Sequence, residues 1–314
     1  MSGTRNLMRH WVVALTLTLV GALASACASR VPDEGGDWQR LFHDGLPRTY
    51  LVHLPPGQGD GKALPLVILL HGGGGDGRDA ARVSGMSAVA DRAGFIAVYP
   101  NGTGRRPGVR TWNATHCCGY AMLNGIDDIG FLGALIQQLQ RDYPVDPRRT
   151  YVAGMSNGGM LAHQAAIAYS KRIAAVGAVG AAMFGEEPRP PNPVAAILIN
   201  GMADKHIPFE GGLSRRAVSR SNMTKEMKPA GYAAAFWARA NGCAEPPGQS
   251  VEGTVERRIY DGCADGAQVA FYVLRDGKHA WPGGEKWRPG SDEPSRAINA
   301  TEVIWDFFAR HPKP

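Results

Sequence analysis

Long apolar runs, internal repeats and blocks of like charge are missing from most of this 314-residue sequence, and cysteines number only five. Its 34 lysines and arginines are scattered among 28 acidic residues, giving a formal net charge of +6. Proteins that bind nucleic acid gather basic side chains on one face, so nucleic acid is not expected as a partner. Beyond the N-terminus, no stretch approaches the roughly 20 apolar residues of a membrane-spanning helix.

The composition that is present suits a globular domain. Hydrophobic residues make up 44% of the chain and charged residues 20%, proportions that are ordinary for folded domains. The length allows one large α/β domain or two smaller domains. Because no low-complexity linker or appended module interrupts the pattern, we expect a single catalytic domain over residues 40–314, preceded by a short tether at 28–39.

Residues 1–27 have the pattern of a targeting segment. Arg5 and Arg9 precede an apolar stretch at 11–23, and small residues follow up to Cys27. The letters LASAC at 23–27 resemble a relaxed lipobox, in which Cys27 would be lipidated. Cleavage at an Ala-x-Ala site, releasing the protein, is the alternative. Either route predicts an exported protein, extracellular, periplasmic or held at the envelope. Contact with a membrane is expected only if the lipid anchor is present.

An exported chain can form disulfides. Cys243 and Cys263 flank a segment rich in proline and glycine, so we expect them to form a local disulfide worth about 3 kcal/mol. That leaves the adjacent Cys117 and Cys118, either free or joined to each other. A metal site built on these two and His116 is a weaker alternative, because adjacent cysteines lack the usual ligand spacing.

Short apolar runs alternate with helical patterns along the chain, which predicts a mostly parallel sheet with helices on both faces. Continuous apolar runs are typical of strands buried on both faces. The expected strands are 48–54, 64–70, 95–99, 150–153, 195–200 and 268–274, and the expected helices are 129–140, 158–168, 232–241 and 298–310.

The letters GMSNGG at 154–159 follow an expected strand and precede an expected helix. This is the strand–turn–helix setting of a nucleophile elbow, which raises a serine hydroxyl above the sheet. The helix that starts behind Ser156 favours negative charge developing there. A turn serine that merely caps a helix is the alternative, and the surroundings argue against it.

The letters HGGGG at 71–75 follow the apolar strand at 64–70. In α/β-hydrolases such a loop supplies one oxyanion-hole N–H and the residue after the nucleophile supplies the other. Here these are Gly73 and Asn157. A surface loop or a phosphate cradle is the alternative, but a phosphate loop needs Gly-Lys-Ser/Thr downstream and the chain has GRD at 77–79. His71 itself suits a structural hydrogen bond better than the role of a base.

Asp204 follows the strand at 195–200 and His279 follows the last strand at 268–274. Serine, acid and histidine in this chain order, each after a strand, is the α/β-hydrolase arrangement. His279 would accept the proton of Ser156 and return it to the leaving alcohol. Asp204 would hold the imidazole in the required tautomer and stabilise the imidazolium.

These residues lie in blocks that resemble the polyhydroxybutyrate depolymerase and feruloyl esterase group of α/β-hydrolases, including LpqC-type lipoproteins. The blocks are LHGG at 70–73, WNA at 112–114, CCG at 117–119, DDIGF at 127–131, VAGMSNGGM at 152–160, GMAD at 201–204, NGC at 241–243 and HAWPGG at 279–284. The resemblance implies a secreted serine esterase with an α/β-hydrolase fold, no cofactor and no metal. It also suggests Trp281, Trp112 and His71 as pocket residues, with packing as the alternative for the two tryptophans.

Two further features concern the disulfides and the substrate. Such proteins often carry a cysteine in the helix after the elbow, and this chain has Ala166 and Ile167 there, so Cys117 and Cys118 lack that partner. A basic segment around 205–230 is expected to form a small lid, which would favour acidic or phenolic acyl groups if it is not simply solvated.

The expected partner is a small or oligomeric ester, and the expected state is a monomer. An acyltransferase and an inactive hydrolase-fold binding protein are the alternatives to an esterase.

Overall fold

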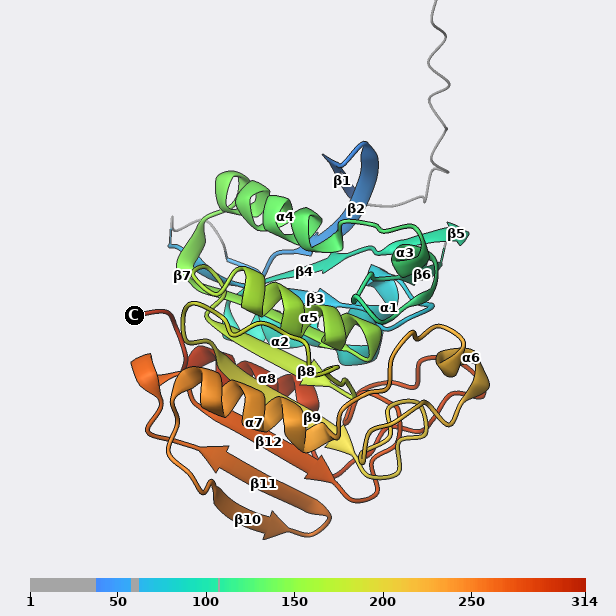
Figure 1. Ribbon diagram of the computed structural model, residues 1–314. Coiled ribbons are helices and arrows are strands. Elements are labelled where there is room, and N and C mark those ends of the chain that lie inside the picture. The colour runs from blue at the N-terminus through green and yellow to red at the C-terminus, as the bar shows by residue number, and fades with distance from the viewer. Residues whose placement is uncertain (1–37, 58–61, 107) are drawn as a thin grey trace, which may run out of the picture. The chain divides into compact units, whose positions relative to one another are not determined.

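The computed structural model describes residues 38–57, 62–106 and 108–314. The expected targeting segment with Cys27 therefore lies outside the described residues, as does most of the tether. The largest sheet has the strand order β1-β2-β4-β3-β7-β8-β9-β12-β11-β10 (Figure 1). Its strands are β1 (Gln39–His43), β2 (Leu46–His53), β3 (Leu64–Leu70), β4 (Ile96–Pro100), β7 (Val145–Met155), β8 (Ala175–Val179), β9 (Ala195–Gly201), β10 (Gly248–Glu252), β11 (Val255–Tyr260) and β12 (Val269–Leu274).

The middle of the sheet is parallel and its two edges are antiparallel. Strands β4, β3, β7, β8, β9 and β12 run parallel to one another. Every residue of β9 and all but the first of β3 are buried, as expected for strands covered on both faces. The hairpins β1–β2 and β10–β11 close the edges with antiparallel pairs. The predicted fold class, a mostly parallel α/β-hydrolase sheet, is confirmed.

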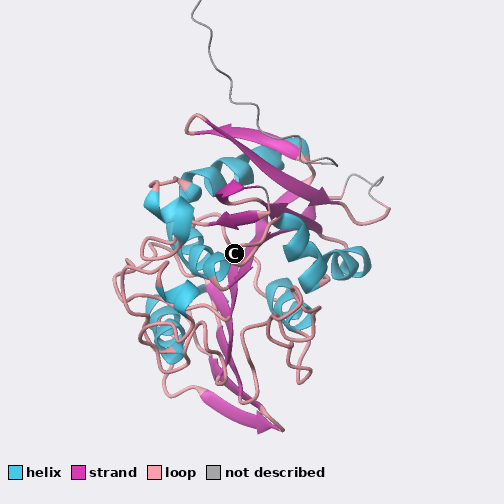
Figure 2. Cartoon of the chain, turned by 90° about the vertical axis from the view of Figure 1, so that its right-hand side faces the viewer, coloured by secondary structure: helices cyan, strands magenta, loops and turns pink. Residues whose placement is uncertain are grey.

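Helices cover both faces of the sheet (Figures 1 and 2). One face carries α4 (Asp128–Asp142), α5 (Asn157–Ala168) and α7 (Ala230–Asn241), and the other carries α1 (Gly77–Ser84), α2 (Met86–Ala93) and α8 (Ala300–Ala309). Two separate apolar clusters correspond to these two layers. Of the six, α1 and α2 were not predicted from the sequence.

Small elements gather beyond the C-terminal ends of the parallel strands. They are the hairpin of β5 (Thr103–Arg106) and β6 (Val109–Thr111), α3 (Gly119–Leu123) and α6 (Ala217–Arg220). In Figure 1 all of them lie to the right of the sheet, with α3, β5 and β6 beyond β4 and with α6 lower, beyond β9. Because β7, β9 and β12 are parallel, the residues that follow them meet at this same edge. The topology therefore brings Ser156, Asp204 and His279 toward one another.

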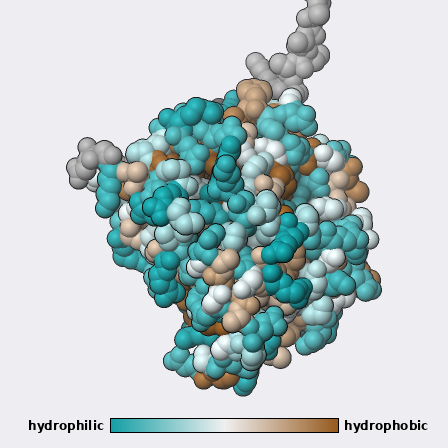
Figure 3. Space-filling model, turned by 60° about the vertical axis from the view of Figure 1, so that its left-hand side comes forward, coloured by the Kyte–Doolittle hydropathy of each residue, from teal (hydrophilic) through white to brown (hydrophobic). Residues whose placement is uncertain are grey.

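The described part of the chain contains two disulfides. Cys243, just after α7, is joined to Cys263, just after β11, as the spacing predicted. Cys117 is joined to its neighbour Cys118, so in this structure neither sulfur atom is a thiolate that could bind a metal. Within the described residues, no helix combines the length and apolar character needed to cross a membrane. Figure 3 shows a face on which hydrophilic side chains predominate and hydrophobic ones are dispersed.

Candidate active site

Ser156 occupies the sharp turn between β7 and α5. Its φ of 54° and ψ of −124° place a non-glycine residue in a region that side chains avoid. Its backbone N–H donates to the carbonyl of Val179 at 2.9 Å. Its hydroxyl makes no capping bond to α5, although Ser156 stands at the N-cap position. The hydroxyl is thus presented above the sheet, as the elbow motif predicts.

The turn is possible only because two neighbouring residues lack a side chain. A Cβ on Gly158 would lie 2.4 Å from the carbonyl oxygen of His71 and 2.6 Å from that of Leu70. A Cβ on Gly154 would lie 2.4 Å from the carbonyl oxygen of Gly158. Main chain therefore packs directly against main chain, and the two glycines of the motif are required for this approach.

The three predicted catalytic side chains form one hydrogen-bonded chain. Nε2 of His279 lies 3.0 Å from Oγ of Ser156, and Nδ1 of His279 lies 2.7 Å from Oδ2 of Asp204. If Nδ1 carries the proton and donates to the carboxylate, Nε2 is free to accept the serine proton. This is the geometry required for nucleophile and base to act together.

Asp204 is held by its second carboxylate oxygen. Oδ1 accepts backbone N–H groups from His206 at 2.7 Å and from Ile207 at 2.8 Å. The side chain is almost fully buried, with 3% of the residue exposed. Both oxygens are therefore occupied, and the carboxylate has a fixed orientation toward His279.

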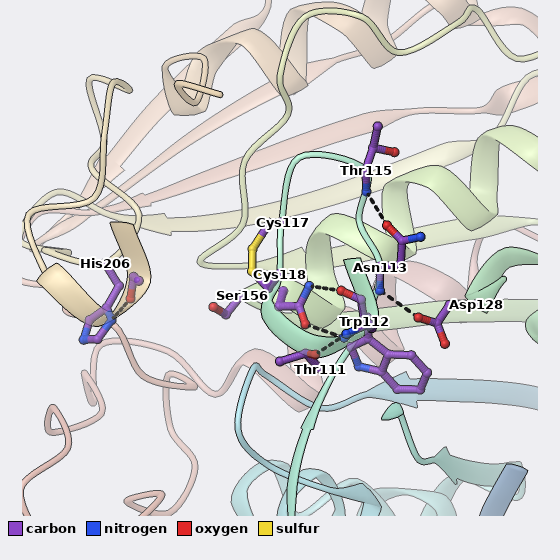
Figure 4. The surroundings of a disulfide bond; sticks show 12 residues. Thr111, Trp112, Asn113, Thr115, Cys117, Cys118, Asp128, Ser156 and His206 are labelled. Atoms are coloured by element: carbon purple, nitrogen blue, oxygen red, sulfur yellow. Dashed lines mark hydrogen bonds between the residues drawn. A yellow bond between two sulfur atoms is a disulfide. The ribbon is translucent and has the colours of Figure 1, made fainter. Parts of the chain in front are cut away.

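The two predicted oxyanion donors lie side by side. A Cβ on Gly73 would be 3.6 Å from the Cβ of Asn157, so the glycine loop runs against the start of α5. The side chain of Asn157 forms two hydrogen bonds with the backbone of Trp112. It accepts from the N–H of Trp112 at 2.7 Å and donates to the carbonyl of Trp112 at 2.9 Å. Figure 4 shows these paired bonds. The backbone N–H of Asn157 stays at the N-terminus of the helix, where developing negative charge is favoured.

Trp112 does not line a pocket, which corrects one prediction. The residue is 0% exposed, and its indole N–H donates to the carbonyl of His71 at 3.0 Å. It lies behind the oxyanion loop and supports it. Asp128 extends this support because its Oδ2 accepts from the backbone of Asn113 at 2.7 Å and its Oδ1 accepts from the buried Arg48 at 2.6 Å.

His71 has the structural role that the sequence suggested. Its Nε2 accepts the backbone N–H of Gly102 at 3.0 Å, so Nδ1 carries the proton and donates to the carbonyl of Gly72 at 2.8 Å. Burial lowers the pKa of His71 to about 4, which keeps the ring neutral in this bonding pattern. The ring borders the inner pocket described next, but both of its nitrogens are already occupied.

Two cavities meet at Ser156. The inner pocket has a volume of about 80 Å³ and is bordered by Met155, His279 and the predicted Trp281, whose indole N–H donates to Thr301. The outer groove is far larger, about 760 Å³, and contains Ser156, Asn157 and the Cys117–Cys118 disulfide. Figure 4 shows this disulfide together with Ser156 and His206. An ester bound at Ser156 can thus extend into a small space and a large one.

The segment after Asp204 forms part of the groove wall, at the position expected for a lid. His206, Ile207, Ser219, Asn222 and Met223 line the groove from this segment. Three arginines of the basic segment expected to form this lid, Arg215, Arg216 and Arg220, are exposed and do not line the groove.

His206 also belongs to the site, although it was not predicted from the sequence. Its ring stacks on that of His279, with centroids 4.5 Å apart and planes 21° apart, and its Nδ1 lies 2.9 Å from Oγ of Ser219. Burial, and next the charge of His279, lower the pKa of His206 to about 4. The position two residues after Asp204 was the only signal in the sequence.

Comparison with known proteins now decides the family. The family model described as Esterase PHB depolymerase matches residues 48–197. A protein named "Putative esterase NocK" from Nocardia uniformis subsp. tsuyamanensis is 31% identical over 285 residues, covering 84% of this chain and 80% of that protein. The chain belongs to the PHB depolymerase esterase family. It is a carboxylic ester hydrolase, as the resemblance implied.

Further relatives bear feruloyl esterase names. Feruloyl esterase B from Piromyces equi is 28% identical over an alignment that covers 74% of this chain and only 42% of that protein. Probable feruloyl esterase C from Aspergillus niger is 27% identical over 85% of this chain and 93% of that protein. Among solved structures, an acetyl xylan esterase from Aspergillus awamori aligns with a TM-score of 0.55 and 15% identity, over 87% of this chain and 99% of that one. That likeness shows the shared α/β-hydrolase fold.

Proposed function

We propose that this esterase works through an acyl-enzyme on Ser156, with His279 as the base and Asp204 as its orienting partner. The continuous hydrogen-bonded chain from Ser156 through His279 to Asp204, at 3.0 and 2.7 Å, is the observation that carries the proposal. The strained elbow and the two adjacent backbone donors, Gly73 and Asn157, support it.

In the proposed reaction, His279 takes the proton of Ser156 as the hydroxyl attacks the ester carbonyl. The N–H groups of Gly73 and Asn157 stabilise the oxyanion, each contributing roughly 3 kcal/mol. The imidazolium then gives its proton to the departing alcohol, which leaves the acyl group on Ser156. Water, deprotonated by the same imidazole, attacks this acyl-enzyme, and the acid departs as Ser156 regains its proton.

The substrate is proposed at a coarser level. Relatives named feruloyl esterases, together with a groove large enough for an aromatic ring, support esters of aromatic or hydroxylated acids. We further propose that the protein is exported and either released or anchored through Cys27. The two disulfides are compatible with an oxidising compartment. Mass spectrometry of the native N-terminus distinguishes the lipidated from the released form.

The proposed mechanism predicts that Ser156→Ala loses activity on the order of 10⁵-fold in kcat on p-nitrophenyl acetate, methyl ferulate and hydroxybutyrate oligomers. A fluorophosphonate probe should modify the wild type once, at Ser156. Ser250→Ala is the matched control, since Ser250 lies on the fully exposed strand β10. Substantial hydrolysis by a folded Ser156→Ala protein would contradict the mechanism, and the ranking of the three substrates would refine the activity.

A further inference from the structure

The two cavities that meet at Ser156 carry opposite charges. Among the described residues that border the outer groove there are three arginines, Arg105, Arg106 and Arg288, and no aspartate or glutamate. The described residues around the inner pocket include Asp79, Glu285 and Asp292, with no lysine or arginine. A substrate spanning both cavities therefore meets positive charge on one side of the scissile bond only.

Local ion pairs moderate the acidic character of the inner pocket. Arg82 approaches Asp79 at 3.4 Å and Glu285 at 3.2 Å, so both carboxylates have a cation beside them. The pocket is also small. Its volume of about 80 Å³ is about half that of a cavity of about 150 Å³ that holds benzene. It therefore suits a short neutral group of a few atoms better than an aromatic or sugar ring.

The outer groove has the room that a ring requires, and Arg288 has a defined position in it. The guanidinium of Arg288 stacks on the ring of Trp287, 3.7 Å from its centroid. Trp287 in turn rests on the oxyanion loop, because a Cβ on Gly74 would lie 3.5 Å from its Cη2. When a guanidinium stacks on an aromatic ring, its N–H groups stay in the plane of the guanidinium and can donate two parallel hydrogen bonds to a carboxylate.

Arg105 and Arg106 come from the β5–β6 hairpin, which is tied to the same loop. Gly74 donates its N–H to the carbonyl of Arg110 at 2.7 Å, and Gly75 and Arg110 form a β-bridge. The hairpin and the loop that carries Arg288 therefore both adjoin the glycine loop, whose Gly73 is an expected oxyanion donor. Cations from two separate parts of the chain converge on one groove.

We infer that the outer groove is a carboxylate-binding subsite, and that the preferred substrates are esters whose larger group carries a free carboxylate while the smaller group is short and neutral. The inference rests on the proposed function, since it concerns the groove beside Ser156. Attraction between the arginines and the carboxylate would position the larger group and would act on binding before the chemical step.

The test uses pairs of esters that differ only in charge. One pair is meta-acetoxybenzoate and meta-acetoxybenzamide, whose short group is the acyl part. The other is monomethyl isophthalate and methyl meta-carbamoylbenzoate, whose short group is the alcohol. For each pair the measured quantity is the ratio of kcat/KM for the carboxylate to kcat/KM for the amide. Comparing that ratio between variants cancels differences in intrinsic reactivity.

For at least one pair, Arg288→Gln should lower this ratio about threefold, and the triple change with Arg105→Gln and Arg106→Gln about tenfold. The wild-type ratio should also shrink in 1 M salt, where the screening length is about 3 Å. Arg172→Gln is the matched control, because Arg172 is exposed and precedes the N-terminal end of β8, whereas Ser156 lies at the C-terminal ends of the parallel strands. Arg215→Gln with Arg220→Gln tests the lid cations that do not line the groove.

A ratio that is the same in wild type and triple variant for both pairs would overturn the inference. So would a drop produced equally by the control or by the lid pair. Either result leaves the proposed mechanism intact as long as the amide esters are hydrolysed by the wild type and not by Ser156→Ala. Failure of the wild type on every ester would instead contradict the proposed function.

Discussion

At the nucleophile, backbone packs against backbone, whereas the ring of His279 is held by side chains. Gly158 approaches the carbonyls of Leu70 and His71 so closely that a Cβ has no space. His279 instead has Asp204 at one nitrogen and the ring of His206 on its face. The first kind of contact depends on the fold of the strands. The second depends on the segment that follows Asp204.

This difference determines which amino-acid substitutions each part of the site can tolerate. A carbonyl oxygen in a central strand cannot move without moving the sheet, so the elbow is limited to glycine at the contact positions. A stacked ring or a hydroxyl can be replaced by another group of similar shape at a cost of one weak interaction. Substitutions at the elbow should therefore act on folding and catalysis together, and those at the side chains around the His279 ring should act mainly on catalysis at neutral pH.

Gly158→Ala should show the largest effect of this kind. The added methyl would meet two carbonyl oxygens at 2.4 and 2.6 Å, forcing α5 away from β3. We expect a loss of about 3 kcal/mol in the free energy of unfolding. We also expect kcat to fall about 100-fold or more, because a shift of about 1 Å in the nucleophile has that effect. Urea denaturation and steady-state kinetics measure the two quantities.

Gly231→Ala is the matched control, since a Cβ there meets nothing within 4 Å and the residue lies in α7. Alanine favours helix, so this variant should be as stable as the wild type or more stable by about 0.5 to 1 kcal/mol. Equal behaviour of the two alanine variants would remove the contrast between a backbone-packed elbow and the rest of the fold.

The parts of the site that the sequence predicted are those governed by local patterns. Ser156 and its glycines lie within six consecutive residues, and the continuous apolar runs of β3 and β9 are recognisable without a partner strand. Asp204 and His279 followed from chain order, because the carboxyl ends of parallel strands meet at one edge. A local contact of the same kind is the N-cap of α4, where the side chain of Asp127 accepts from the N–H of Gly130.

The parts that were missed depend on long-range packing. Strand β8 has the letters AVGAV, which carry little apolar signal, and it is buried because helices close over both its faces. A Cβ on Gly177 would meet both Phe308 and Ala153, contacts that no local pattern shows. Trp112 looked like a pocket residue, but its backbone pairs with Asn157, 45 positions away. The stack of His206 on His279 depends in the same way on how the lid segment folds back.

Substitution of His206 should have a smaller effect than that of Gly158. The neutral ring on the face of His279 should stabilise the imidazolium formed during the reaction, by analogy with a cation over an aromatic face. We expect His206→Leu to lower kcat/KM about fivefold and His206→Phe, which keeps a ring, to stay within about twofold of the wild type. If both variants lost kcat/KM equally, the aromatic ring at this position would not stabilise the imidazolium.

The same position predicts an effect of pH on stability. His206 has a pKa of about 4 in the folded protein, lowered by burial and then by His279 and Arg216, while Asp204 and Asp292 oppose the shift. In the unfolded chain the pKa is about 6.5, so the unfolded state binds more protons between these values. Acidification through this window therefore destabilises the fold, and His206→Phe removes that penalty. The melting temperature of the variant relative to wild type should rise from pH 7 to pH 4.5, whereas a constant difference would contradict the lowered pKa.

Ser219→Ala should have the smallest effect and gives the sharpest contrast with the elbow. Its hydroxyl lies 2.9 Å from Nδ1 of His206, so it fixes the ring that covers His279 without touching the triad. One hydrogen bond between partly exposed neutral groups is worth roughly 0.5 to 1.5 kcal/mol, and only part of that should reach the transition state, so we expect about a twofold loss in kcat/KM. In the His206→Leu background the same substitution should change nothing, because the ring it positions is gone. Additive losses in the double variant would mean that Ser219 acts on the groove directly, and that the ring of His279 is held by more than this stack.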